Sequence, residues 1–329
     1  MSELPPPPVP DGPLFKWIQQ NRSFDRIRSG LRGLRPWKGQ QVNVYDVLRF
    51  FVLGLINGSV AMRSAAISFR LFLAFFPAMI LLLSIIPYTP LETAEVLSSL
   101  EMLFPMQVVE LFEQTVADLI NQRQGTLISV GVILLLYYAS SSVNSILLSF
   151  GESPHVPGKP HWLLYRLLSV VLLFVLTFLL GVAVFLIGFS GDVIRWMDAH
   201  QWINADAIPW LTLARWTLSF ALVYASVNML YHAGSGAMKA WGVLNVGATG
   251  ATLLLVLTTW TFSWIIGQFS SYNTLYGSLG TLMLTLVWLN SSSSILLLGF
   301  ELNAAVSRAQ MDATKSHESD RMNPIEITH

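Results

Sequence analysis

The stretch SVVLLFVLTFLLGVAVFLIGF, residues Ser169–Phe189, decides the fold class of this chain. It contains no charged side chain, and it is about as long as the 20 apolar residues that a helix needs to cross a bilayer. Hydrocarbon offers no hydrogen bonds to the backbone, so such a segment must form a helix. Because it is apolar all round, we expect it to face lipid.

The composition extends this conclusion to the whole chain. Of 329 residues, 53% are hydrophobic and only 12% are charged, whereas about 25% of the residues in soluble proteins are charged. The mean hydropathy is +0.56. These values indicate an integral membrane protein. The absence of cysteine excludes disulfides and thiolate metal sites.

The pattern of apolar stretches predicts an all-α, polytopic membrane bundle. Six stretches are long enough to span: Met62–Ile86, Gly125–Phe150, Trp162–Phe189, Pro209–Tyr231, Trp241–Gly267 and Ser278–Val306. Lysine and arginine are concentrated before the first span and recur at every second loop, whereas the loop after the first span is acidic. Because basic residues mark the cytoplasmic side, we expect both termini in the cytoplasm.

The segments outside the spans complete the expected organisation. Leu14–Arg35 has apolar residues at helical spacing with arginines opposite, which predicts a helix on the anionic lipids of the cytoplasmic leaflet. A basic helix packed on cytoplasmic loops is the alternative. The expected divisions are a disordered proline-rich tail (1–13), basic amphipathic interfacial helices (14–61), a six-helix membrane domain (62–306) with a helical extracytoplasmic loop (88–124), and a disordered cytoplasmic tail (307–329).

Polar residues four or seven apart line one face of five of the spans. Buried in a bilayer, such groups need partners or water, so we expect a polar cavity among these spans. The alternative is ordinary packing, in which small and hydroxyl residues let helices approach closely. The candidate cavity residues are Arg70, Pro77, Tyr137, Ser141, Asn144, Tyr224, Asn228, Asn245, Thr249, Thr252, Asn290, Ser294 and Glu301.

Two of these residues are charged. Arg70 lies one heptad beyond Arg63, about 10 Å deeper at 1.5 Å per residue, and Glu301 lies near the cytoplasmic end of the last span. The two side chains can lie at the same depth in the membrane, so we expect an Arg70–Glu301 pair, or Arg70 facing a cavity open to the cytoplasm. Snorkelling of both side chains to the interface is the alternative. Pro77 predicts a kink or hinge in the first span.

The end of the chain resembles a known family. YNTLYGSLGTLMLTLVWLNSSSSILLLGFELNAAV, Tyr272–Val306, is similar to the terminal signature of the YihY/virulence factor BrkB family, and RSAAISFRLFLAFFP is similar to its first-span motif. The resemblance implies a bacterial inner-membrane protein that transports a lipid or another amphiphile; an older family label, ribonuclease BN, is a mislabelling. The signature residues are Tyr272, Asn273, Tyr276, Gly277, Trp288, Gly299, Glu301 and Asn303.

These features favour a transporter, exporter or flippase for a lipid-like, amphiphilic or anionic substrate. A non-transporting scaffold that binds envelope partners is the alternative. A nuclease would need clustered metal ligands and a basic groove. The spacing of Glu152, His155 and His161 is a weak match to a metal site and does not predict a nuclease. No phosphate-binding loop is present either. We therefore expect no enzyme, no cofactor or metal and no nucleic-acid partner; membrane lipids are the expected partners, and the sequence does not decide the oligomeric state.

Overall fold

The computed structural model describes residues 44–57, 59–85, 125–156, 162–188, 190–202, 204–235, 245–268 and 278–322. The described residues are helical, which confirms the predicted all-α class. Their elements are α3 (Val44–Asn57), α4 (Val60–Ile85), α7 (Gly125–Gly151), α8 (Trp162–Gly188), α9 (Ser190–Ala199), the 3-10 turn η2 (Ala205–Ala207), α10 (Ile208–Gly234), α11 (Val246–Gln268) and α13 (Ser278–Met322).

Five of these helices are long and apolar enough to cross a membrane, namely α4, α7, α8, α11 and α13. The helix α8 has the highest mean hydropathy of the five, 3.2, and it exposes large apolar side chains such as Val171, Phe174 and Phe178. That agrees with a helix that faces lipid. The predicted fourth span coincides with α10, a 27-residue helix that is not among the five.

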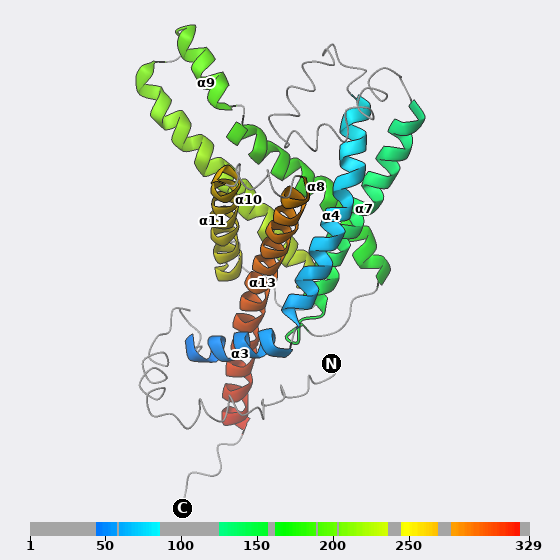
Figure 1. The fold of residues 1–329 in the computed structure, drawn as a ribbon. Coiled ribbons are helices and arrows are strands. Elements are labelled where there is room, and N and C mark those ends of the chain that lie inside the picture. The colour runs from blue at the N-terminus through cyan, green and yellow to red at the C-terminus, as the bar shows by residue number, and fades with distance from the viewer. Residues whose placement is uncertain are drawn as a thin grey trace, which may run out of the picture.

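Contacts between successive long helices arrange them in a ring, which Figure 1 shows from the side. Following the ring, α4 packs on α7, α7 on α8, α8 on α10, α10 on α11, α11 on α13, and α13 on α4. The short helix α3 crosses α13 at one end of the ring, and α9 lies at the other. We call these the α3 end and the α9 end.

The core is concentrated toward the α3 end. Phe150 of α7, Tyr231 of α10 and Phe300 of α13 meet there, each fully buried. The rings of Phe150 and Phe300 stack with centroids 4.2 Å apart, and Tyr231 meets Phe150 edge-on at 5.5 Å. Toward the α9 end the helices diverge (Figure 1), and large side chains such as Met283 and Trp264 are exposed. The ring is therefore tightly closed only at the α3 end.

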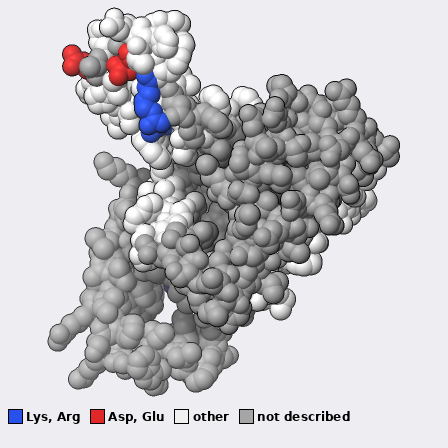
Figure 2. Space-filling model, turned by 45° about the horizontal axis from the view of Figure 1, so that its top comes forward, with Lys and Arg blue, Asp and Glu red and all other residues white. Residues whose placement is uncertain are grey.

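The α9 end carries charge of both signs. On the face shown in Figure 2, acidic and basic side chains gather on the described segment that projects from the rest. The exposed residues Arg195, Asp198 and Asp206 lie in α9 and η2. This tip packs against α8 and α10.

Two helix boundaries differ from the sequence analysis. The last helix, α13, continues to Met322, so the expectation of disorder from residue 307 is wrong for residues 307–322. The reason is packing: Ala305 and Ala309 of α13 are buried against Val47, Phe50 and Leu53 of α3. The fifth helix begins at Val246 instead of Trp241, because the Asn245 side chain caps it.

Several expectations lie outside the described residues. They are the proline-rich tail (1–13), the basic helix Leu14–Arg35, the extracytoplasmic loop (88–124), the end of the chain (323–329), and the signature residues Tyr272, Asn273, Tyr276 and Gly277.

Candidate functional site

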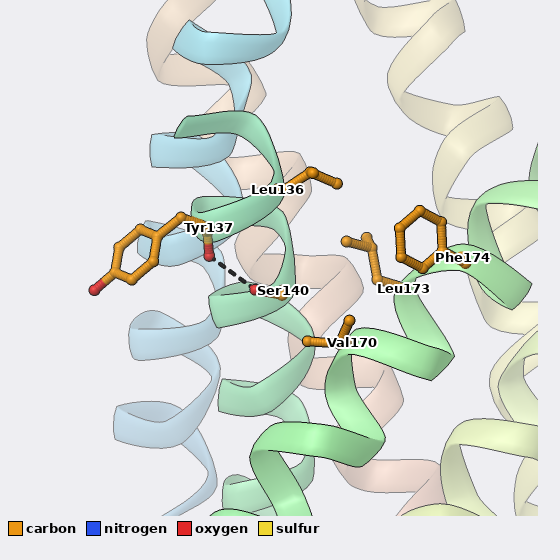
Figure 3. A pocket seen from close by; sticks show the side chains of 6 residues that line it. All are labelled: Leu136, Tyr137, Ser140, Val170, Leu173 and Phe174. Atoms are coloured by element: carbon orange, nitrogen blue, oxygen red, sulfur yellow. Dashed lines mark hydrogen bonds between the residues drawn. The ribbon is translucent and has the colours of Figure 1, made fainter. Parts of the chain in front are cut away.

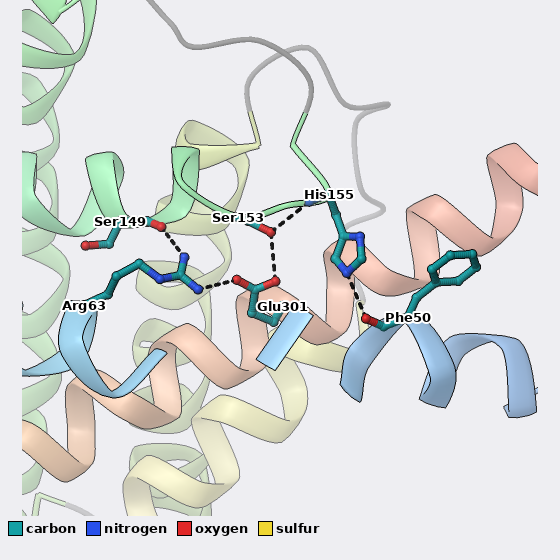
Figure 4. A network of polar contacts seen from close by, with 6 residues as sticks. All are labelled: Phe50, Arg63, Ser149, Ser153, His155 and Glu301. Carbon is teal, nitrogen blue, oxygen red and sulfur yellow. Dashed lines mark hydrogen bonds and ion pairs between the residues drawn. The ribbon is translucent and has the colours of Figure 1, made fainter. Parts of the chain in front are cut away.

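A buried ion pair joins the first and last membrane helices at the α3 end (Figure 4). Arg63 Nη2 of α4 lies 2.6 Å from Glu301 Oε1 of α13, with the two side chains 5% and 0% exposed. Arg63 Nη1 also donates to the carbonyl oxygen of Ser149 at 2.5 Å. That carbonyl lies in the last turn of α7, where helix carbonyls lack partners and attract cations. One guanidinium therefore ties three helices together.

Two residues after α7 complete this network. Ser153 Oγ donates to Glu301 Oε2 at 2.8 Å, so both carboxylate oxygens have partners. His155 Nε2 donates to the carbonyl oxygen of Phe50 in α3 at 2.9 Å; a carbonyl can only accept, which assigns the ring proton to Nε2. Gly54 makes room, since a Cβ there would lie 2.9 Å from both Glu301 Oε2 and His155 Nε2.

Burial lowers the pKa of His155 below its usual value of 6.5, and the nearby Arg308 acts in the same direction. The Phe50 carbonyl and Glu301 oppose the shift but do not reverse it. The folded protein therefore holds His155 neutral at pH values where the unfolded chain already binds a proton.

We expect this histidine to make the protein less stable in mild acid. Because the unfolded state binds the extra proton, the free energy of unfolding is unaffected above about pH 6.5 and falls as the pH drops below it, by at most about 1.4 kcal/mol per pH unit. Thermal unfolding of the purified protein in detergent at pH 7.5 and 5.5 measures this. His155→Gln keeps a side-chain donor without the titration and should lose that part of the pH dependence. An unchanged pH dependence in this variant would contradict the assignment.

A second network, of three asparagines, lies on the opposite side of α13. Asn245 caps α11, accepting from the backbone N–H of Ala248 at Oδ1 (2.7 Å). The same oxygen accepts from Asn303 Nδ2 at 2.7 Å, and Asn245 Nδ2 donates to Asn228 Oδ1 of α10. Tyr224 adds a contact, because its hydroxyl accepts from the Asn245 backbone N–H at 3.1 Å. The start of α11 is thus held by side chains of α10 and α13.

Two glycines allow α11 and α13 to touch. A Cβ at Gly247 would lie 2.0 Å from the carbonyl oxygen of Gly299, and one at Gly299 would lie 2.7 Å from both the Gly247 carbonyl oxygen and Ala251 Cβ of α11. Asn303 Oδ1 accepts from the Gly247 backbone N–H at 2.7 Å. The signature residues Gly299 and Asn303, one turn apart, therefore face α11, whereas Glu301 between them faces α4.

The expected pair of Arg70 with Glu301 is wrong. The partner of Glu301 is Arg63, one heptad earlier on the same face of α4. Arg70 is exposed, and its Nη1 donates to Ser141 Oγ of α7 at 3.1 Å. Helical periodicity could place Arg63 and Arg70 on one face, but only the packed helices decide which of them meets α13.

The other candidate residues lie in different environments. Thr252 is fully buried and its hydroxyl has no hydrogen-bond partner; the Oδ1 of Asn144 also lacks one. Ser294 Oγ donates to the Asn290 backbone carbonyl at 2.8 Å, and Asn290 itself is exposed. Pro77 is buried within α4, and α4 continues through it. Thr249 and Tyr137 are exposed, and Trp288 in α13 is partly buried.

A pocket of about 240 Å³ lies between α7 and α8 (Figure 3). Its lining is almost wholly apolar: Leu136, Tyr137, Ser140, Val170, Leu173 and Phe174. Ser140 is the polar exception, and its hydroxyl donates to the Tyr137 carbonyl at 3.1 Å. The pocket is thus not the polar cavity that the stripes predict, and it is suited to an alkyl chain.

Sequence reasoning missed the roles of Arg63, Ser153 and His155. In the sequence, Arg63 was counted among the basic residues near the start of the first span and served as the reference for the depth of Arg70, but no partner was expected for it, although an arginine at the fourth position of a membrane helix is a signal for a partner. Ser153 and His155 belong to the stretch considered for metal binding. In the structure His155 bonds Phe50 and Glu152 is exposed; His161 lies outside the described residues. Within the described ranges, no three His, Asp or Glu side chains gather as a metal site would require.

Comparison with known proteins agrees with this architecture. The family described as Virulence factor BrkB matches residues 54–324. The chain is 27% identical over 249 residues to the "Putative ribonuclease-like protein YfkH" of Bacillus subtilis, covering 75% of this chain and 90% of that protein. It is 25% identical over 290 residues to a "UPF0761 membrane protein" of Rhodospirillum centenum, covering 86% of this chain and 61% of that one. A "UPF0761 membrane protein" of Tolumonas auensis is 24% identical over 195 residues, or 59% of this chain and 62% of that protein.

No solved structure matches the chain. The family match begins at Gly54 within α3 and extends past the end of α13, so it contains both networks except Phe50. The relatives of the chain include several membrane proteins. This multi-pass membrane chain is therefore a member of the Virulence factor BrkB family.

Proposed function

We propose that this chain is a transporter of the bacterial inner membrane, without enzymatic activity, that moves a small anionic or amphiphilic, lipid-like substrate. The observation that carries the proposal is the buried Arg63–Glu301 pair within two membrane-spanning helices. Ionisable residues inside membrane helices are costly and usually serve the passage of a substrate, an ion or a proton. A pair that only joined helices could be replaced by apolar packing without that cost.

The shape of the ring supports the same proposal. The Phe150–Tyr231–Phe300 cluster and the ion pair close it at the α3 end, and the helices diverge toward the α9 end (Figure 1). This is the form of a transporter closed on one side. Opening would require these three aromatic side chains to separate and Arg63 to leave Glu301 or Ser149, and a bound anionic substrate would favour that step.

The charge distribution supports an orientation. Basic residues precede α4 and follow α13, and the loop after α4 is acidic, so in this proposal the α3 end faces the cytoplasm. The basic helix Leu14–Arg35 and the crosswise helix α3 would then rest on the anionic leaflet. Exposed Leu48, Val52 and Ile56 form one apolar stripe on α3 that suits the headgroup boundary.

A non-transporting scaffold is the second candidate. It is favoured by the polar groups at the α3 end, where Asn228, Asn245 and Asn303 bond one another instead of lining an open space. A scaffold would keep this end sealed, whereas a transporter must open it.

Cysteine labelling separates the two candidates, because the native chain has no cysteine. We expect Thr252→Cys, at a fully buried position two turns beyond Asn245 on α11, to react slowly with a membrane-impermeant thiol reagent, since transport requires that water reach it transiently. Proteoliposomes containing the full-length variant, treated with reagent added on each side, provide the measurement.

Two exposed positions calibrate the experiment. Asn290→Cys, on α13 toward the α9 end, should react faster than Thr252→Cys. Phe178→Cys, 70% exposed on α8, should stay unlabelled because it faces lipid, where thiols do not ionise. If Thr252→Cys is as inert as Phe178→Cys from both sides, the sealed scaffold is correct and transport through this ring is wrong.

A further inference from the structure

Two arginines from different helices converge on one exposed face of α7. Arg70 of α4 donates to Ser141 Oγ at 3.1 Å, and the guanidinium carbon of Arg166 of α8 lies 5.5 Å from the centre of the Tyr137 ring. Tyr137 and Ser141 are one helical turn apart and thus on the same face. Tyr137 is 57% exposed and Arg70 is also exposed, so the face is open to the surroundings of the bundle.

Neither contact neutralises the positive charge. A serine hydroxyl and an aromatic ring supply partial charge only, and the described carboxylate within the neighbouring helices, Glu301, is bound to Arg63 and Ser153. Both arginines lie within membrane-spanning helices, where an uncompensated guanidinium is unfavourable. Two such groups that contact successive turns of one helix can bind an anion, and arginine binds phosphate in a bidentate manner.

The apolar pocket adjoins this face. Val170 lies one turn beyond Arg166 on α8, and Leu136 neighbours Tyr137 on α7; both line the pocket together with Leu173 and Phe174. Figure 3 shows the Tyr137 side chain pointing away from Leu173 and Phe174, so this side chain borders the pocket without filling it. A ligand with a charged head and an alkyl chain could touch both parts.

We propose that this surface, formed by Arg70, Arg166, Tyr137, Ser141 and the pocket between α7 and α8, binds a phospholipid with an anionic headgroup. The arginines hold the phosphate, and one acyl chain occupies the pocket. A free phosphate ion is not the preferred ligand, because it would contact the arginines but not the apolar lining of the pocket. The site is on the outside of α7 and does not depend on transport through the ring.

Native mass spectrometry of the full-length protein in detergent tests the proposal, with phosphatidylglycerol and phosphatidylcholine as probes. Hydrogen bonds to charged groups are each strong enough to change affinity about tenfold. We therefore expect Arg70→Gln or Arg166→Gln to weaken phosphatidylglycerol binding by about tenfold, and the double variant to bind it no better than phosphatidylcholine. Glycerol phosphate, which has the headgroup without chains, should not displace the bound lipid.

Arg215→Gln is the matched control. Its guanidinium also lies near an aromatic ring, 5.3 Å from the centre of Trp216, but on α10, and its loss should leave lipid binding unchanged. Val170→Trp should fill the pocket and weaken phosphatidylglycerol binding with both arginines present. The proposal is overturned if the double arginine variant, folded as judged by gel filtration, retains wild-type preference for phosphatidylglycerol. It is also overturned if Arg215→Gln reduces binding equally, or if glycerol phosphate competes as well as the lipid.

Discussion

Glu301→Gln is expected to destabilise the protein by about 3–5 kcal/mol, because it leaves the Arg63 charge buried without a counter-charge. The substitution conserves volume, and an amide oxygen can still accept from Ser153, so loss of charge is the main change. Arg63→Met should cost a similar amount, since it strands the carboxylate of Glu301, which is 0% exposed. The measurement is thermal and denaturant unfolding of the purified variants in lipid-free detergent.

The double variant distinguishes a pair from two independent sites. Arg63→Met with Glu301→Gln removes both charges, so we expect it to be less destabilised than the sum of the single changes by several kcal/mol. Additive losses would contradict direct pairing. Arg70→Gln serves as the control: its side chain is exposed, so we expect a change within about 0.5 kcal/mol. A loss as large as that of Arg63→Met would show that Arg70 also supports the carboxylate.

Gly247→Ala is expected to have the second largest effect, a loss of about 3 kcal/mol, the upper end of the range for overpacked cores. The new methyl group would lie 2.0 Å from the Gly299 carbonyl oxygen and 2.6 Å from Asn303 Cγ. The first of these is backbone and cannot turn aside. The helices α11 and α13 would have to separate, which would lengthen the bond from the Gly247 backbone N–H to Asn303.

Gly250→Ala is the control within the same helix. A Cβ at Gly250 would meet nothing within 4 Å, so the alanine should stabilise the protein by about 0.5–1 kcal/mol through its better helix propensity. Opposite signs for the two substitutions would establish the close contact of α11 with α13. Equal effects at the two positions would mean that the helices do not approach as closely as the structure indicates.

The sequence predicted the helices well, because each long apolar segment has a single stable form in lipid. The expected third span began at Trp162 and the last at Ser278, as α8 and α13 do. The end of α13 was missed. Residues 307–322 are polar enough to read as a tail, and their helix is continuous with a segment packed on α3, a contact that local composition does not reveal.

The candidate site was predicted in part. Glu301 and the three polar residues Tyr224, Asn228 and Asn245 do take part in networks. Helical periodicity gave a wrong expectation where it assigned all polar residues on one face of a helix to the same environment. On α11, Thr252 is fully buried whereas Thr249 and Thr259 are exposed. Thr249 lies nearer the packed α3 end than Thr252 and is nevertheless exposed, so the neighbouring helices, and not the position along the stripe, decide which residues are covered.

By itself, the sequence determined that this chain is a membrane bundle of long helices, since hydrocarbon permits few other forms for such segments. It also determined which face of each helix is polar, because 3.6 residues complete a turn. The tertiary structure alone decided which faces meet. Arg63 and Glu301 are 238 residues apart in sequence, and their pairing follows from the order and rotation of helices around the ring. Those are set by contacts such as Gly247 with Gly299, which no single helix specifies.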